Sequence, residues 1–288
     1  MGVERLGEAL EPQEPYEVNR LGGGVEDPRV TYVRPLGLFV MTYTAFLPPH
    51  HPCMALAVSS DLVTWKRLGL HYAREHGTPD LNRHANKDGV PFSDLVQDSL
   101  GRPALALLHR PTYSMLNTPA GPLLLPGPVG PDTAEYIWIS YIALEGARAD
   151  IHHLTQAYGH RPVMAPQAAW ERLKIGAGAP PVLLPYGWLL LYHGVSGTET
   201  ETEKHVRYCA GAAILDRDDP TRVLYRSPRP ILEPEGPQET QGSVPDVVFP
   251  TATDRRDDGH LDVYYGAADT VIGVARLGIP AQLPLQAG

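Results

Sequence analysis

The stretch Gly187-Trp-Leu-Leu-Leu-Tyr-His193 decides the fold because it is one of four copies of the same phrase. The other copies are Gly37-Leu-Phe-Val-Met-Thr-Tyr43, Gly101-Arg-Pro-Ala-Leu-Ala-Leu-Leu-His109 and Gly259-His-Leu-Asp-Val-Tyr-Tyr265. A turn glycine opens each copy, an apolar run follows, and an aromatic or imidazole ring closes it. The glycines are 64, 86 and 72 residues apart. Short strands repeated at intervals of tens of residues predict radial repetition, as in a β-propeller.

Further short apolar runs surround each phrase and complete the predicted blades. The first blade is expected at 30–33, 37–45, 54–59 and 65–68, and the second at about 90, 103–109 and 136–141. The third is expected at 181–184, 187–193, 211–215 and 223–225, and the fourth at 247–249, 261–265 and 271–275. We therefore predict an all-β fold, a five-bladed propeller in which four blades are clearly visible and the first blade is incomplete.

The incomplete blade is inferred from an internal echo between the N-terminal region and a later crossing. Leu10-Glu-Pro-Gln-Glu-Pro-Tyr-Glu17 resembles Leu232-Glu-Pro-Glu-Gly-Pro-Gln-Glu239, which would link one blade's outer strand to the next blade's inner strand. Residues 1–25 are therefore expected to be the remnant of a first blade within a single catalytic domain spanning 1–288. Residues 115–135 are expected to be a Pro/Gly-rich loop insertion without regular structure, placed either on the surface or over the funnel mouth.

Composition limits the classes of function. The net charge of −9 leaves no basic stripe for nucleic acid, and an anion site would have to be built locally from clustered basic side chains. No apolar run is long enough to span a membrane, so a soluble cytoplasmic protein is expected. Cys53 and Cys209 lie in strand-like runs and are interpreted as small buried apolar groups rather than a disulfide.

The first candidate for chemistry is Glu26-Asp27-Pro28-Arg29, which follows the glycines Gly22 to Gly24 at the entrance of an inner strand. A carboxylate at that place can act as a general acid if its surroundings raise its pKa. The alternative is a turn in which Asp27 accepts hydrogen bonds from backbone amides.

Four basic residues stand at matching places near the inner strands: Lys87, Arg110, Lys174 and His193. Arginine supplies a planar fork, lysine a point charge and histidine a tunable donor, which together are typical of a phosphate site. The alternative for each residue alone is a solvated charge or a satisfied core group.

Asp269 ends the fourth phrase beside tyrosine rings and is a candidate for binding sugar hydroxyls, with a simple turn residue as the alternative. The His50-His51 and His152-His153 pairs lack acidic partners at metal-ligand spacing, so no metal site is expected.

Taken together, six phrases resemble glycoside hydrolase family 130, the β-mannoside phosphorylases and their hydrolytic relatives. The resemblance runs from about residue 10 to 278, and the phrases lie at 26–29, 109–111, 174–178, 187–195, 244–250 and 264–269. It implies a five-bladed propeller that cleaves β-mannosides with inversion. Inorganic phosphate would act as the co-substrate, no cofactor is implied, and α-mannose 1-phosphate would be released.

The resemblance also assigns roles by position. Asp27 matches the general acid, and Lys87, Arg110, Lys174 and His193 match the phosphate-binding set. Asp269 matches a mannose-binding carboxylate, and Tyr208 is placed near the same pocket together with Glu26 and Arg29. Inverting hydrolases use a second carboxylate to activate water, whereas a cationic pocket replaces that base when phosphate attacks.

Three functions stay open at this stage. The retained basic set favours a glycoside phosphorylase acting on β-1,2- or β-1,4-linked manno-oligosaccharides or mannosyl-glucose. A β-mannosidase and a non-catalytic sugar-binding propeller are the alternatives. The family pattern includes roughly one further blade before Glu26. A truncated start, an abbreviated first blade or a ring completed by a neighbouring subunit, which would make a homo-oligomer, are therefore all compatible with the sequence.

Overall fold

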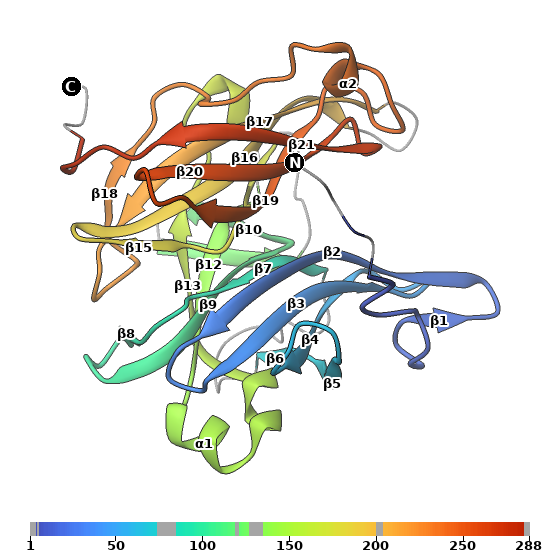
Figure 1. Ribbon diagram of the computed structural model, residues 1–288, viewed down its shortest axis with the longest axis vertical. Helices are drawn as coiled ribbons and strands as arrows, with labels where there is room; N and C mark the ends of the chain where they lie inside the picture. Colours follow the sequence, from blue (N-terminus) through green and yellow to red (C-terminus); the bar gives the residue numbers. More distant parts are fainter. Residues whose placement is uncertain are drawn as a thin grey trace.

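The computed structural model describes residues 4, 6–73, 85–118, 121–126, 135–199 and 204–284. These residues form four sheets, whose strands are mostly antiparallel, and a separate hairpin. The described residues include only two short α-helices, α1 (Leu144–Ala149) and α2 (Pro237–Thr240). The described helices are all too short and polar to cross a membrane. The all-β prediction is therefore confirmed (Figure 1).

The first sheet has the order β1-β2-β3-β4-β5, and its four longer strands fall where the sequence predicts the first blade. Its strands are β1 (Val18–Asn19), β2 (Gly22–Val33), β3 (Leu38–Phe46), β4 (Cys53–Ser59) and β5 (Lys66–Leu70). β1 pairs with the start of β2, because Gly22 and Gly23 adopt positive φ angles that suit a tight reversal. Residues 18–25, expected in the remnant of another blade, thus belong to this sheet.

The second sheet has the order β6-β13-β12-β9-β7, with β8 paired to β9. Its strands are β6 (Tyr72–Ala73), β7 (Asn86–Pro91), β8 (Val96–Gln97), β9 (Pro103–Pro111), β12 (Ile137–Ile142) and β13 (Gln156–Met164). Three of these strands were expected from the sequence. The outer strand β13 was not, because Gly159 at positive φ and Pro162 interrupt its alternation.

The third and fourth sheets contain the remaining strands. The third is β14-β16-β17-β18 with β15 paired to β16, and the fourth is β19-β20-β21. Their strands are β14 (Lys174–Ala177), β15 (Val182–Leu184), β16 (Gly187–Glu199), β17 (Lys204–Leu215), β18 (Val223–Arg226), β19 (Val248–Arg255), β20 (His260–Ala267) and β21 (Val271–Gly278). The innermost strand of the third sheet is thus β14 together with β15, and not the 181–184 segment alone.

One prediction is wrong. Residues 115–135 were expected to lack regular structure, but their first part belongs to a hairpin of β10 (Tyr113–Thr118) and β11 (Gly121–Pro126). Residues 119–120 and 127–134 lie outside the described residues.

The sheets pack face to face in chain order around a common centre. One apolar core joins the first and second sheets, another joins the second and third, and another joins the third and fourth. The inner strand β19 of the last sheet then contacts β2 of the first. This is a four-bladed propeller arrangement, which matches the four blades visible in the sequence. A separate fifth blade is not among the residues that the structure describes.

A buried carboxylate ties the N-terminal region to the first sheet. Glu17 accepts hydrogen bonds from the Tyr43 hydroxyl at 2.6 Å and the Arg67 Nε at 2.9 Å, and from the backbone amides of Gln13 and Glu14. Burial opposes ionisation, but these donors outweigh it and hold the pKa of Glu17 below its ordinary value. We call this set of three side chains the Glu–Tyr–Arg triad.

The third sheet repeats the triad with the same chemistry. Glu171 accepts from the Tyr192 hydroxyl at 2.7 Å and from Arg226 at 2.8 Å, and the backbone amides of Gln167 and Ala168 complete its shell. In each case the arginine comes from the fourth strand, β5 or β18, and the glutamate comes from the crossing before the sheet. The triad therefore fastens the outer strand of a blade to the crossing that enters it.

We predict that Arg226→Ala lowers the free energy of unfolding by about 3–5 kcal/mol, because it leaves the buried Glu171 charge without its partner. Arg222→Ala is the matched control, since its ion pair with Asp216 is exposed and should contribute about 0–1 kcal/mol. Urea titration of both variants measures the difference. Equal, small effects for the two variants would contradict the assignment of the triad.

Candidate active site

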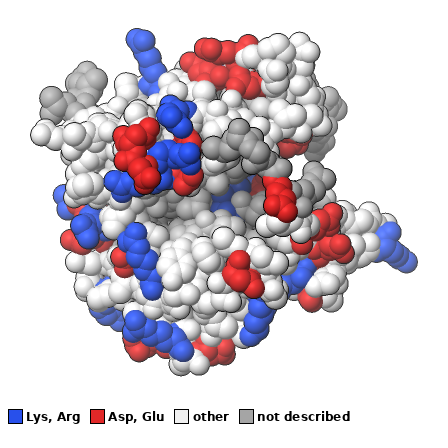
Figure 2. Space-filling view, viewed as in Figure 1, with Lys and Arg blue, Asp and Glu red and all other residues white. Residues whose placement is uncertain are grey.

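The blades surround a cavity of about 650 Å³ that opens to solvent. Figure 2 shows a hollow near the centre of one face, with charged side chains around it. The lining residues are Glu26, Asp27, Lys87, Tyr208, Val244, Val247, Phe249, Gly266 and Asp269. Five of the nine residues selected from sequence therefore line one cavity: Glu26, Asp27, Lys87, Tyr208 and Asp269. They come from β2, β7, β17 and the turn that follows β20, so each of the four sheets contributes to the cavity.

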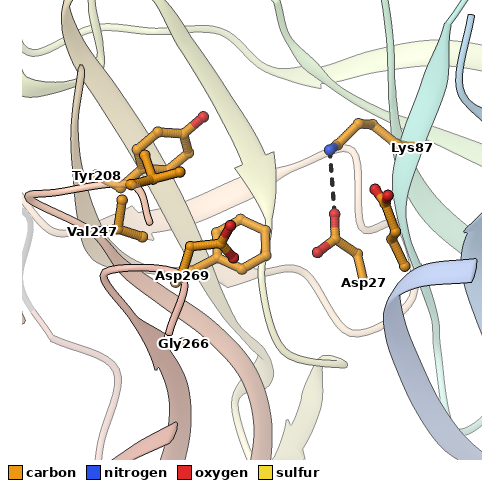
Figure 3. A pocket seen from close by; sticks show the side chains of 9 residues that line it. Asp27, Lys87, Tyr208, Val247, Gly266 and Asp269 are labelled. Carbon is orange, nitrogen blue, oxygen red and sulfur yellow. Dashed lines mark hydrogen bonds and ion pairs between the residues drawn. The ribbon is translucent and has the colours of Figure 1, made fainter. Parts of the chain in front are cut away.

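Asp27 lies at an irregularity in β2, where the register to β3 shifts between Glu26 and Arg29. Its φ angle is 52°, a left-handed conformation that aspartate tolerates better than most residues. The Asp27 carboxylate lies 3.2 Å from the Lys87 Nζ, and both side chains are 30% exposed. This irregularity in β2 presents the carboxylate to the cavity, and among the described residues no backbone amide donates a hydrogen bond to it (Figure 3).

Two further carboxylates share this cavity. Burial raises the pKa of Glu26, and the negative charges of Asp27 and Asp269 add to the rise, while Lys87 opposes it. Asp269 follows β20 in a turn with φ at 52° and lies on the opposite side of the cavity from Asp27, with Tyr208 and Val247 (Figure 3). A sugar bound between the two sides would meet acceptors from both.

Sequence reasoning missed Asp88, which is the central group beneath the cavity. The residue is 3% exposed to solvent. Its carboxylate lies 2.6 Å from the Arg110 Nε and 3.4 Å from the His193 Nε2. Burial works against ionisation, but Arg110 and His193 more than compensate and hold the pKa of Asp88 well below its ordinary value. The signal was present, because Lys87-Asp88-Gly89 occupies in β7 the place that Glu26-Asp27-Pro28 occupies in β2.

Asp88 brings together two of the basic residues selected from sequence. Arg110 also forms an ion pair through Nη1 with Glu135, so two carboxylates share its guanidinium. Among the described residues, these two carboxylates contact Nε and Nη1 of the guanidinium, and neither contacts Nη2. His193 is fully buried, and desolvation lowers its pKa even though Asp88 acts in the opposite direction. The imidazole is therefore neutral at neutral pH.

Lys174 reaches the same region from β14, where it pairs in register with Val195. Gly176, two residues further on the same face, pairs with His193, and a Cβ atom at Gly176 would collide with Asp88 and the His193 ring. Only glycine lets β14 approach this closely. Of the four basic residues, Lys87 lines the cavity, Arg110 and His193 lie beneath it, and Lys174 flanks them.

Arg29 is buried below the cavity rather than in its lining. Its Nε donates to the Gly178 carbonyl at 2.6 Å, and its guanidinium lies 5.0 Å from the centre of the Phe249 ring. Phe249 was not selected from sequence, yet its ring also packs against His193 at 4.6 Å and Tyr208 at 6.2 Å between centroids. This ring forms the apolar floor that a sugar face requires.

Among the described residues, no group of three or more His, Cys, Asp or Glu side chains is placed to hold a metal ion. Both cysteines are free, as the sequence predicts. Carboxylates, a lysine and aromatic rings line the central cavity of this propeller. Such groups can form hydrogen bonds with sugar hydroxyls and pack against the apolar face of a sugar.

Comparisons with known proteins identify the family. The sequence model described as β-1,4-mannooligosaccharide phosphorylase matches residues 142–282. A 1,2-β-oligomannan phosphorylase of Thermoanaerobacter sp. is 32% identical over 259 residues, covering 88% of this chain and 68% of that protein. A β-1,2-mannobiose phosphorylase of Listeria innocua is 40% identical over 248 residues, covering 86% of this chain and 56% of that protein.

Solved structures agree with the sequence comparisons. A β-1,2-mannobiose phosphorylase from Listeria innocua, in complex with β-1,2-mannobiose, superposes with a TM-score of 0.67 at 26% identity. The match covers 93% of this chain and 60% of that chain, so this chain spans well under the full length of that relative. The chain belongs to glycoside hydrolase family 130, the family of mannoside phosphorylases.

We predict that Asp88→Asn destabilises the protein by about 3–5 kcal/mol at pH 7, because it removes the buried carboxylate between Arg110 and His193. The Asp88 pKa is lower in the folded than in the unfolded state, so its contribution is present above about pH 4 and is lost as pH falls further. The stability difference between wild type and variant should therefore shrink below about pH 4.

Urea titrations at pH 7, 5, 4 and 3 test this expectation. Asp94→Asn is the control, because the ion pair of Asp94 with Arg34 is exposed and the asparagine oxygen can still accept the hydrogen bond from the Leu95 amide. A difference that stays constant down to pH 3, or no difference at pH 7, would contradict the role assigned to Asp88.

Proposed function

We propose that this chain is an inverting glycoside phosphorylase that cleaves β-mannosides with inorganic phosphate and releases α-mannose 1-phosphate. The observation that carries the proposal is the 3.2 Å contact between Asp27 and Lys87, because it joins a solvent-accessible carboxyl group to a basic cluster in one cavity. Family members with mannobiose, oligomannan and mannosyl-glucose phosphorylase names support the same chemistry.

The proposed reaction assigns proton donation to Asp27 and nucleophilic attack to phosphate. Asp27 donates a proton to the glycosidic oxygen as the bond from that oxygen to the anomeric carbon breaks. A phosphate oxygen forms the new bond to the anomeric carbon from the opposite face, which inverts its configuration. The proton that the attacking hydrogen phosphate gives up restores Asp27, so protons balance over one turnover.

Phosphate would be held by the basic residues around Asp88. Lys87 and Lys174 would supply point charges, and the Nη2 end of Arg110 would donate to a phosphate oxygen. His193, neutral and fixed against Phe249, would donate or accept a hydrogen bond rather than contribute charge. Asp269, Glu26 and Tyr208 would bind the sugar hydroxyls, and Arg29 would support the floor beneath Phe249.

A β-mannosidase is the second candidate, and two observations favour it. Asp88 and Glu135 already neutralise Arg110, which reduces the positive potential available to phosphate. The raised pKa of Glu26 would make its carboxylate a stronger base toward water than an ordinary glutamate. Hydrolysis would then use Asp27 as the acid and Glu26 as the base.

Product analysis distinguishes the two candidates. The protein is incubated with β-1,2- and β-1,4-linked mannobiose, with and without inorganic phosphate, and the products are separated by anion-exchange chromatography. We expect α-mannose 1-phosphate to form only with phosphate, and Lys174→Ala to raise the KM for phosphate. Release of free mannose at equal rates under both conditions, unchanged in Lys174→Ala, would establish hydrolysis instead.

We further predict that Asp27→Asn lowers kcat by a factor on the order of 10²–10⁴, because the amide cannot deliver the proton. Asparagine also tolerates the left-handed backbone at this position, so the fold should be retained. Asp94→Asn serves as the control for a lost surface charge. Activity near that of wild type in Asp27→Asn, with an unchanged melting temperature, would show that another group is the acid.

A further inference from the structure

A chain of hydrogen bonds between buried side chains crosses the second sheet. His109 of β9 is fully buried, its Nδ1 lies 2.9 Å from the Asn86 Oδ1 of β7, and its Nε2 lies 2.6 Å from the Ser140 Oγ of β12. The Ser140 Oγ lies 2.6 Å from the His160 Nδ1 of β13. Side chains thus join four neighbouring strands, from the inner strand β7 to β13 (Figure 1). None of these four residues lines the central cavity, and the proposed reaction gives them no role.

The acceptors in this chain fix the places of its protons. An amide oxygen can only accept, so the His109 Nδ1 carries the hydrogen that is donated to Asn86. A neutral ring then accepts at Nε2, and the Ser140 hydroxyl donates to it. The Ser140 oxygen is left to accept from the His160 Nδ1. His109 therefore makes two hydrogen bonds of different kinds, one as a donor toward β7 and one as an acceptor toward β12.

The surroundings keep the His109 ring neutral. Two ionisable rings lie near it, those of His71 and His160, with centroids at 5.9 Å and 6.3 Å. Burial holds the pKa of His109 well below its ordinary value, and the two neighbouring histidines act in the same direction. Burial also lowers the pKa of His71, to about 3, and among the described residues no carboxylate acts on either ring. His109 is therefore neutral at neutral pH and keeps one donor and one acceptor nitrogen.

The bond between His109 and Asn86 lies beside two basic residues of the proposed phosphate set. Asn86 immediately precedes Lys87, and His109 immediately precedes Arg110. Lys87 pairs in register with Arg110. Successive side chains of a strand point to opposite faces. The hydrogen-bonded pair therefore lies on the face of the sheet opposite to the two basic side chains, and it joins the same two stretches of backbone.

β7 depends on such an attachment because its register with β9 shifts directly after Lys87. The pair before the shift consists of Asn86 and Pro111. The Asn86 amide donates to the Pro52 carbonyl and Pro111 has no amide hydrogen, so neither amide of this pair donates across the ladder. The bond from the Asn86 side chain to His109 joins the two strands at this place instead.

We propose that His109 is a positioning residue of the phosphate site, acting through its hydrogen bond to Asn86. The bond holds the backbone at Lys87 and Arg110 in the register that directs both basic side chains toward phosphate. This inference rests on the proposed phosphorylase function, because it concerns how phosphate is bound. Loss of the bond would let the start of β7 shift and move Lys87 relative to Arg110. Asp27 is held by β2, so proton donation would change less than phosphate binding.

Two substitutions of His109 separate its two hydrogen bonds. The amide nitrogen of asparagine stands where Nδ1 stands, so His109→Asn keeps the donor toward Asn86 and loses the bond to Ser140. The amide of glutamine reaches the place of Nε2, so His109→Gln keeps the bond to Ser140 and loses the bond to Asn86. Both variants replace a buried ring by an amide, so their melting temperatures should fall by similar amounts.

The KM for phosphate, measured at saturating mannobiose, should distinguish the two variants. We expect His109→Gln to raise it about tenfold, comparable with the loss of one hydrogen bond to a charged group, and His109→Asn to change it less than about twofold. The kcat of both variants should stay within about threefold of wild type, because the acid is not displaced. A purely structural role of His109 would give the same KM in both.

A second pair of variants keeps the imidazole and removes its partners one at a time. Asn86→Ala removes the acceptor of Nδ1, and Ser140→Ala removes the donor to Nε2. Both sites are buried, so both variants should lose stability. We expect Asn86→Ala to raise the KM for phosphate about tenfold and Ser140→Ala to leave it unchanged. The double variant Asn86→Ala/His109→Gln should be no worse than either single variant, because both changes remove the same bond.

Isothermal titration calorimetry with inorganic phosphate accompanies the kinetics, so that binding is followed without turnover. Equal phosphate affinities in His109→Gln and His109→Asn, equal affinities in Asn86→Ala and Ser140→Ala, or additive effects in the double variant would overturn this inference. The proposed function would then still stand if wild type forms α-mannose 1-phosphate. Wild type that neither binds nor consumes phosphate would overturn the proposed function, and this inference with it.

Discussion

The ion pair between the buried Asp88 carboxylate and Arg110 is the interaction on which the centre of this propeller depends. Asp88 also contacts His193, so one carboxylate joins β7, β9 and β16 at the point where the second and third sheets meet. A guanidinium and a carboxylate cannot be buried there separately, because either alone would carry an uncompensated charge. Gly176 completes the constraint, since any side chain at that position would displace both partners.

This network also explains how an acidic protein can hold basic groups beneath its cavity. The chain has a net charge of −9, and Asp88 and Glu135 balance Arg110 locally. Such balance allows the basic groups to be buried, and it reduces the positive potential that they present to the cavity. The electrostatic potential of the cavity is therefore set by the carboxylates around the basic groups and not by the basic groups alone.

The sequence predicted most strands because each sheet repeats a turn glycine followed by an apolar run. It did not predict β13 or the β10–β11 hairpin, since glycine and proline within those segments conceal the alternation of a strand. At the site, Lys87 was predicted as one of four basic residues around an anion, and Asp27 was predicted as the acid that faces them; the structure places both in the lining of one cavity. Asp88 was missed although its place in β7 matches that of Asp27 in β2. Phe249 was missed because its role depends on which face of an inner strand points to the cavity, and sequence alone does not determine that face.

Three aspartates show how equivalent places in the blades acquire different tasks. Asp27, Asp88 and Asp246 all adopt the left-handed conformation at the entrance of an inner strand, with φ angles of 52°, 57° and 62°. Asp27 faces the cavity beside Lys87, whereas Asp88 is covered by β14 and paired with Arg110. The backbone repeat therefore supplies a set of similar positions, and burial by the neighbouring sheet decides which carboxylate is accessible from the cavity.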